Sequence, residues 1–354
     1  MDESLEFTIG KLKVNTIQGI IQGGMGVGIS MSGMAGAVAN QGGAGIISSV
    51  GLGFLNDYKG NYVENNKRAL REEIRKARKI SNGVIGVNIL RAVTDYESLV
   101  KVCDEEKVDL IIVGAGLPSN LPELVKNEKI SLVPIVSSKR AAKIITTKWI
   151  KKYNKIPDAF IVEGPKAGGH LGFKHEELIS THPPKLEDIA KEVITFANSF
   201  NDPIPVIVAG GIYTGQDIYE YKKLGAAGVQ MGTRFVTTEE CDAHYNFKQA
   251  YLNARKDDLV IIKSPVGMPG RAINNRFLKN LEVKGKLKIN CPYRCLTACK
   301  VEKARYCIAQ ALVNSYFGDV DHGLIFCGQN AYRIDKIITV KELIHELLSE
   351  LKEV

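Results

Sequence analysis

The stretch VEGPKAGGHLG, residues 162–172, decides how the rest of the chain is interpreted. It continues an apolar run over residues 159–162, which is typical of a buried strand, and it then turns into glycines that flank His170. Gly168 and Gly169 lack a Cβ atom, so the backbone there can approach a flat or bulky ligand closely. One interpretation is a sheet that presents a titratable side chain to a ligand. The other is a sharp turn whose histidine caps a helix, and the loop alone leaves both open.

Seven further apolar runs resemble the one that precedes this loop. The predicted strands cover residues 16–22, 44–49, 84–89, 108–113, 131–136, 159–162, 204–209 and 227–231. They alternate with predicted helices, and continuous apolar strands of this kind indicate a parallel sheet that is covered on both faces. Eight such units before about residue 235 favour an α/β fold of the (β/α)8 TIM barrel type over an open, doubly wound sheet.

The domain organisation follows from the change of pattern after the eighth strand. We expect residues 1–236 to form the barrel and residues 237–354 to form a mostly helical C-terminal subdomain that covers the substrate. This subdomain contains a cysteine-rich segment and closes with an amphipathic helix at the C-terminus.

Residues that are unusual for a buried strand gather after the predicted strands. They are Met25, Asn88, Ser137, Glu163, His170, Gly210, Gly211, Gly232 and Thr233. TIM barrels carry their active sites at the carboxyl ends of the strands, so this distribution predicts one site and makes His170 its catalytic candidate.

The last two strands end in residues typical of a phosphate site. The sequences AGG, residues 209–211, and MGT, residues 231–233, follow strands seven and eight, where barrels commonly bind phosphate. A helix that begins at residues 214–217 would direct its positive end to the same anion. The alternative is two ordinary glycine-rich turns.

Composition excludes several functional classes. The net charge of +8 comes from scattered lysines, and with 7% aromatic residues and no basic stretch interleaved with them, nucleic-acid binding has little support. No segment approaches the roughly 18 continuous apolar residues of a membrane span. The acidic N-terminus has no signal-peptide pattern, so we expect a cytoplasmic protein that does not bind membranes. Seven cysteines, an odd number, make a disulfide framework unlikely in that compartment.

Four of the cysteines are clustered in CPYRCLTACKVEKARYC, residues 291–307. The spacing of Cys291, Cys295, Cys299 and Cys307 is C-x3-C-x3-C-x7-C. Thiols in such a cluster can hold an iron–sulfur cluster or zinc, but the spacing matches neither C-x2-C zinc pairs nor the usual ferredoxin run. Helical spacing places the first three on one face, where cysteines often serve as small buried apolar residues, and we favour this interpretation over a metal site.

Two basic residues have both a functional and a structural interpretation. Lys166 either places a positive charge near an anionic ligand or is simply solvated, as turn lysines usually are. Arg271 lies in a predicted turn, residues 267–271, and either faces a phosphate of a cofactor or acyl carrier or holds that turn to the barrel.

Five motifs, in this order, resemble the nitronate monooxygenase family, formerly called 2-nitropropane dioxygenase. They are IIQGGMG (20–26), GVNI (86–89), EGPKAGGHLG (163–172), PVIVAGGI (205–212) and GAAGVQMGTRF (225–235). SPVGMPGRAINN (264–275) and CGQN (327–330) continue the resemblance. The same family includes the flavin-dependent enoyl-ACP reductase II branch.

The resemblance implies an FMN cofactor and assigns residues to it. The flavin ring would lie near Gly24 and Met25, with Asn88 at its edge and Ser137 and Glu163 nearby. Gly168 and Gly169 would let the histidine loop pass close to the flavin, and His170 would be catalytic. The phosphate would lie on Gly210, Gly211, Gly232 and Thr233, with Gln230 and Met231 alongside.

The implied reaction is the oxidation of alkyl nitronates with O2 at the flavin. The alternative is an FMN-dependent and NAD(P)H-dependent enoyl-ACP reductase, with an enoyl thioester as substrate and acyl carrier protein as a partner. A second alternative is a flavin-binding protein without turnover. A homo-oligomer is compatible with the sequence, which does not decide the oligomeric state.

Overall fold

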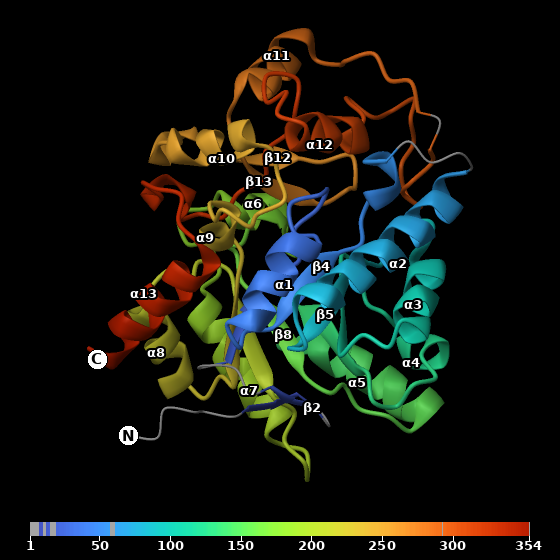
Figure 1. Ribbon diagram of the computed structural model, residues 1–354, viewed down its shortest axis with the longest axis vertical. Helices are drawn as coiled ribbons and strands as arrows, with labels where there is room; N and C mark the ends of the chain where they lie inside the picture. Colours follow the sequence, from blue (N-terminus) through green and yellow to red (C-terminus); the bar gives the residue numbers. More distant parts are fainter. Residues whose placement is uncertain (1–6, 10–11, 15–18, 57–60, 292, 354) are drawn as a thin grey trace.

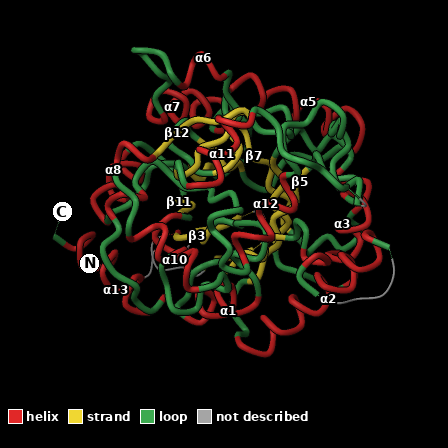
Figure 2. The backbone as a smooth tube through the Cα atoms, turned by 90° about the horizontal axis from the view of Figure 1, so that it is seen from above, coloured by secondary structure: helices red, strands yellow, loops and turns green. Residues whose placement is uncertain are grey.

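The computed structural model describes residues 7–9, 12–14, 19–56, 61–291 and 293–353. Its centre is an eight-stranded parallel sheet with the strand order β3-β11-β10-β8-β7-β6-β5-β4. The parallel bridge between Ile21 and Ala44 joins the two outer strands, so the sheet closes into a barrel. Seen from above, the strands surround the centre and helices surround the strands (Figure 2). The predicted (β/α)8 TIM barrel is confirmed, with all of its predicted strands apart from residues 16–18, which lie outside the described residues.

The barrel strands are β3 (Ile20–Gln22), β4 (Gly45–Ser48), β5 (Ile85–Leu90), β6 (Leu110–Gly114), β7 (Ser131–Val136), β8 (Phe160–Glu163), β10 (Val206–Ala209) and β11 (Gly228–Met231). The helices of the barrel layer are α1 (Ser32–Asn40), α2 (Tyr62–Ile80), α3 (Tyr96–Glu105), α4 (Leu121–Leu124), α5 (Lys139–Tyr153), α6 (His175–Leu178), α7 (Leu186–Ala197), α8 (Gly215–Lys223) and α9 (Thr233–Val236). The C-terminal third adds α10 (Tyr245–Leu252), α11 (Arg276–Lys284), α12 (Ile308–Tyr316) and α13 (Val340–Lys352). Short 3-10 turns lie at η2 (Leu52–Phe54), η3 (Lys256–Asp258) and η4 (Ala331–Arg333).

The strands are apolar throughout because both of their faces are buried. On β6, Leu110 and Ile112 belong to the cluster that fills the barrel, whereas Ile111 and Val113 belong to the larger cluster beneath the helices. Alternate residues of a strand point to opposite faces, so a strand between two apolar layers has no polar position except near its ends. Polar side chains are therefore collected at the ends of the strands.

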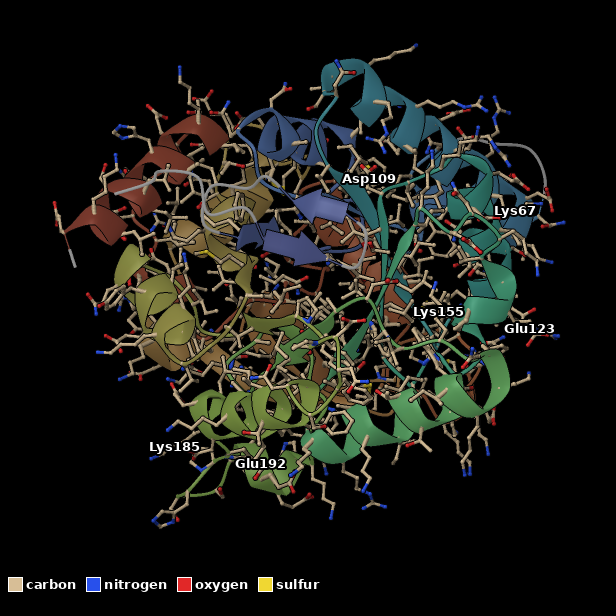
Figure 3. All side chains as sticks on the ribbon, turned by 90° about the horizontal axis from the view of Figure 1, so that it is seen from below. Lys67, Asp109, Glu123, Lys155, Lys185 and Glu192 are labelled. Carbon is tan, nitrogen blue, oxygen red and sulfur yellow. The ribbon has the colours of Figure 1, made fainter. Side chains whose placement is uncertain are left out.

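A hairpin covers the end of the barrel at which the strands begin. Strands β1 (Phe7–Ile9) and β2 (Leu12–Val14) pair in an antiparallel manner, and the Ser131 hydroxyl donates a hydrogen bond of 2.9 Å to the carbonyl of Ile9. The view from below shows the hairpin across this face, with charged side chains such as Lys67, Glu123 and Glu192 around the rim (Figure 3). This end is therefore closed, and the opposite end remains for ligands.

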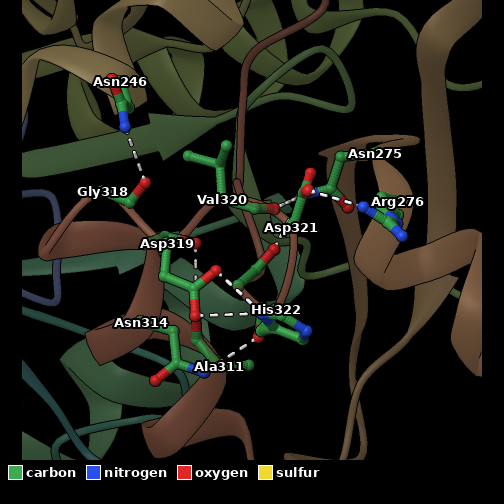
Figure 4. A network of polar contacts seen from close by, with 12 residues as sticks. Asn246, Asn275, Arg276, Ala311, Asn314, Gly318, Asp319, Val320, Asp321 and His322 are labelled. Atoms are coloured by element: carbon green, nitrogen blue, oxygen red, sulfur yellow. Dashed lines mark hydrogen bonds and ion pairs between the residues drawn. The ribbon is translucent and has the colours of Figure 1, made fainter.

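The C-terminal third covers that opposite end (Figure 1). Strands β12 (Leu259–Lys263) and β13 (Pro269–Ile273) form an antiparallel pair, to which β9 (Gly169–His170) of the histidine loop adds a third strand. Hydrogen bonds hold the loop that follows α12. Asn275 donates to the carbonyls of Val320 and Gly323, and the Asp319 carboxylate contacts the His322 ring (Figure 4).

Helix α13 returns to the barrel and packs against α8 and α1. Two of its carboxylates contact the barrel: Glu350 accepts a hydrogen bond from the Gly215 backbone, and Glu346 pairs with Arg234. The predicted closing helix is thus present and occupies the place of the eighth helix of the barrel. The division at residue 236 into two domains stays a prediction.

Two local predictions for the C-terminal third are wrong. Arg271 lies within strand β13, since residues 269–273 pair with both β12 and β9, and not in a turn. The described cysteines of residues 291–307 lie in an irregular segment and not on a helix. None of the described helices is long and apolar enough to cross a membrane.

Candidate functional site

A cavity of about 410 Å³ opens at the carboxyl ends of the barrel strands. Every residue that the sequence assigned to catalysis or FMN lines it: Gly24, Met25, Asn88, Ser137, Glu163, Gly168, Gly169, His170, Gly210, Gly211, Gln230, Met231, Gly232 and Thr233. Lys166 also lines it, and of the four clustered cysteines only Cys295 does. The structure brings the candidate residues together, while their individual roles stay predictions.

His170 is held in place by pairing with the C-terminal third. Its strand β9 pairs with Gly270 and Arg271, and its Nε2 atom lies 2.7 Å from the Ser264 hydroxyl. The ring also meets the edge of Phe326, with 5.0 Å between the ring centroids. Burial lowers the pKa of His170 to about 4, so the imidazole is neutral at pH 7, with one ring nitrogen that donates and one that accepts a hydrogen bond.

The two glycines before His170 have different structural reasons. A Cβ atom on Gly168 would lie 2.7 Å from the backbone of Cys327, so this glycine allows the loop to pack against residues 327–328. Gly169 has a φ of +70°, a backbone conformation that residues with a side chain rarely adopt. A Cβ atom placed on it would have no other atom within 4 Å. Of these two glycines, Gly168 is needed for close packing, whereas Gly169 leaves open space beside His170.

Arg271 holds β13 of the C-terminal third to the histidine loop of the barrel. Its guanidinium is buried, with 6% of the residue exposed, and donates hydrogen bonds of 2.7 and 2.6 Å to the carbonyls of Pro165 and Ala167. Burial lowers its pKa, although arginine keeps its charge. The structural interpretation of Arg271 is confirmed, because both bonds end on the loop itself.

The polar end of the cavity lies at β10 and β11. Gly210 and Gly211 both have a φ of +97°, and a Cβ atom on Gly211 would lie 2.9 Å from the Lys166 side chain. The segment 327–330 packs on the same end: Asn330 donates to the Gly211 carbonyl at 2.7 Å, and Gly328 passes the Thr233 hydroxyl. The glycines therefore allow three loops to converge here without side chains between them.

Helix α8 does not contribute to this end, so the prediction that its N-terminus faces the anion is wrong. Amides at and just before its start are already satisfied: Asp217 accepts hydrogen bonds from the Tyr213 and Thr214 amides that precede the helix, and Glu350 accepts one from Gly215, its first residue. Residues 213–217 are absent from the lining of the cavity. The carboxylates of Asp217 and Glu350 therefore accept the amide hydrogen bonds that an anionic ligand at the start of α8 would need.

Glu163 is the acidic residue that ends β8, next to Ala209 of β10. It lines the cavity, and burial raises its pKa to about 8. The carboxyl group is therefore mostly protonated at pH 7, and the cavity avoids a negative charge at this position.

The raised pKa of Glu163 predicts a loss of stability with increasing pH. Between its ordinary pKa of 4.5 and its folded pKa of about 8, the unfolded chain releases a proton that the folded chain keeps. The stabilising effect is complete below the lower value and is lost as the pH rises through the higher one. Glu163→Gln keeps the shape without the titration, so the Tm of the wild type should fall relative to this variant between about pH 5 and about pH 9. A difference in Tm that is constant with pH would contradict the assignment.

Gln230 supplies an unsatisfied acceptor in the wall of the cavity. Among the described residues its Oε1 atom is buried and has no hydrogen-bond partner. Buried amide oxygens are normally paired, and an unpaired one at a cavity wall is typical of a site for a ligand that donates a hydrogen bond. The flavin ring has such an N–H donor, so Gln230 fits the cofactor that the sequence resemblance implies.

The described residues contain no group of three or more His, Cys, Asp or Glu side chains arranged to hold a metal ion. The four clustered cysteines are free thiols, each half-buried. Of these four, Cys295 lines the cavity and the other three do not.

Comparisons with known proteins identify the family. A model of the family described as nitronate monooxygenase matches residues 8–350. The chain belongs to the nitronate monooxygenase family. A probable nitronate monooxygenase of Staphylococcus aureus strain JH9 is 28% identical over 300 residues, which cover 74% of this chain and 77% of the relative. The family is one of enzymes that act on small molecules, so the chain is an enzyme.

Solved structures of two related proteins agree with this family. FabK from Thermotoga maritima is 30% identical, with a TM-score of 0.72, and the match covers 95% of this chain and 93% of that one. The nitroalkane oxidase of Streptomyces ansochromogenes is 20% identical, with a TM-score of 0.73 and coverage of 94% and 95%. At 20% identity, the nitroalkane oxidase shows only that the fold is shared. At 30% identity, FabK resembles this chain in sequence as well as in fold.

Sequence reasoning missed Ser264 and Phe326, both of which contact His170. Each was adjacent to a recognisable signal, because Ser264 opens the motif SPVGMPGRAINN and Phe326 precedes CGQN. Both motifs were recognised as part of the nitronate monooxygenase pattern without a role for their individual residues.

Proposed function

We propose that this protein is an FMN-dependent enzyme that oxidises alkyl nitronates. The observation that carries the proposal is the neutral, oriented His170 in the same cavity as a glycine-lined polar end and the unsatisfied Gln230 oxygen. Membership of the nitronate monooxygenase family supports it.

The residues of the cavity fit FMN at both of its ends. Gly210, Gly211, Gly232 and Thr233 would hold the phosphate, while Gln230 and Asn88 would bind the ring edge. When bound, FMN supplies the redox chemistry, accepting electrons from the substrate and passing them to O2. The volume of about 410 Å³ lies within the usual range for sites of this kind.

The protein's own part is to bind the substrate and to manage its charge. His170 is neutral in the absence of ligand, so it is able to hydrogen-bond the nitro oxygens of a nitronate. Its lowered pKa makes it a weak base, so it would take the α-proton of a neutral nitroalkane only when the bound ligands raise that pKa. Ser264 fixes the ring through Nε2, so the imidazole does not need to reorient during the reaction. Protonated Glu163 leaves the cavity without a carboxylate that would repel the anionic substrate.

The similarity to FabK, at 30% identity over 95% of the chain, supports a second candidate, the FMN-dependent enoyl reductase. In that reaction NAD(P)H provides the electrons, and His170 would stabilise the enolate oxygen or protonate the α-carbon. The same cavity is suitable for both reactions because each develops charge beside one histidine.

An anaerobic absorbance spectrum separates these candidates. The purified protein is supplied with FMN, and NADH or an alkyl nitronate is added in separate samples. We expect rapid bleaching of the flavin bands by the nitronate and none by NADH. Bleaching by NADH, with turnover of an enoyl thioester, would replace the first candidate by the second. FMN bound but reduced by neither reagent would indicate a flavin-binding protein without turnover.

A further inference from the structure

The segment of residues 286–307 connects α11 to α12 and runs over the covered end of the barrel (Figure 1). In its described part it has no helix or strand, apart from an isolated bridge between Leu296 and Val93. Irregular loops longer than about 12–15 residues are uncommon inside compact domains and usually have a function.

Very little apolar burial holds this segment together. Of its described side chains only Leu296 and Tyr306 are buried. Its ends are joined by a hydrogen bond of 2.8 Å from the Leu287 amide to the Arg305 carbonyl. Its middle is attached at the Cys295 carbonyl, which accepts a hydrogen bond from Thr94 at 3.1 Å. Holding so long a loop in one conformation costs conformational entropy, and the contacts within the loop are too few to offset that cost.

The four cysteines of this segment form one group in space. The thiols of Cys291, Cys299 and Cys307 all act electrostatically on Cys295, and those of Cys291 and Cys307 act on Cys299 as well. All four are half-buried free thiols.

The segment that carries the thiols is basic in sequence. Residues 286–307 contain one acidic residue, Glu302, and the basic residues Lys286, Lys288, Arg294, Lys300, Lys303 and Arg305. This environment suits a group that carries net negative charge.

The arrangement does not suit a single metal ion. Zinc binds its thiolates at about 2.3 Å around one point, and the described residues contain no such preformed ligand group. An iron–sulfur cluster is wider than an ion, so its cysteine ligands are further apart, and with four thiolates it is anionic. We propose that Cys291, Cys295, Cys299 and Cys307 bind a [4Fe–4S] cluster beside the cavity.

The proposed cluster would lie next to the active site. Cys295 and Leu296 both line the cavity, and the carbonyl of Cys295 is fixed to the segment that follows β5. The cluster would thus order the wall of the cavity that its ligands form. This inference does not depend on which substrate the enzyme uses.

The test measures cluster content directly. The full chain is purified without oxygen, incubated with ferrous iron, sulfide and dithiothreitol, and separated from unbound reagents. We expect about four iron and four acid-labile sulfide per chain, with an electron paramagnetic resonance signal after reduction by dithionite. Cys291→Ser and Cys299→Ser should each lose most of both, whereas Cys103→Ala, at a buried cysteine outside the segment, should keep them.

Thermal unfolding of each variant checks that it is folded before its iron content is compared. Iron and sulfide in the wild type no higher than in the variant with all four cysteines replaced by serine would overturn the proposal. So would about one zinc per chain without sulfide, or disulfide bonds among these four cysteines in the anaerobic protein.

Discussion

His170→Ala should retain FMN and lose at least about 100-fold in kcat/KM with the best substrate. The imidazole lines the cavity, is neutral and is held in one orientation by Ser264, so its removal takes away its hydrogen bond to the substrate and a group that could exchange a proton with it. The nearest atoms around the Cβ positions of Gly210, Gly211 and Gly232, which would hold the cofactor phosphate, belong to residues other than His170. Steady-state kinetics, together with the flavin absorbance of the purified variant, test both parts of this expectation.

Ser264→Ala is the matched control for this variant. It keeps the imidazole and removes one hydrogen bond to it, so we expect a smaller loss, roughly 2-fold to 12-fold. An unchanged kcat/KM in His170→Ala would exclude a catalytic role. Equal losses in both variants would indicate that the orientation of the ring matters as much as its presence.

Gly24→Ala should destabilise the protein and release the cofactor. A Cβ atom at Gly24 would lie 2.3 Å from the Cβ atom of Asn88 and 3.3 Å from Ile46, both on barrel strands that have no room to move. Forcing a methyl group into a packed site costs about 1–3 kcal/mol, which lowers the Tm of a protein of this size by several degrees. The displacement of Asn88 would also deform the predicted contact with the flavin ring.

The adjacent glycine provides the control. At Gly23 a Cβ atom would have its closest contact at 3.5 Å, an ordinary van der Waals distance, so Gly23→Ala should unfold close to the wild-type temperature. Both melting curves are measured without FMN, which separates packing from cofactor binding. A similar Tm for the two variants would show that the contact between Gly24 and Asn88 is not tight.

The barrel could be predicted from the sequence because its signal is local. Each strand is a short apolar run that is buried on both faces, and the residues at its carboxyl end, such as Asn88 and Glu163, break that run visibly. Since all parallel strands place these ends on one side, the residues of the cavity could be collected without knowledge of the packing.

The partners of these residues could not be predicted, because distant segments provide them. His170 pairs with a strand a hundred residues later in the chain, and two residues are too short a strand to have a pattern of their own. The N-terminus of α8 has the sequence of a free anion site, yet Glu350 from the last helix occupies it. The first three cysteines recur at the spacing of a helix, yet the described residues around them form none.

The packing of α13 against both α8 and α1 has a consequence for how the protein is made on the ribosome. Synthesis proceeds from the N-terminus, so α1 and α8 leave the ribosome with an apolar face exposed, and that face stays uncovered until residues 340–352 are translated. The Gly215 amide likewise has no Glu350 carboxylate before that point. The completed barrel wall is therefore a property of the finished chain, and a nascent chain that stalls before α13 would expose a surface for chaperones or for aggregation.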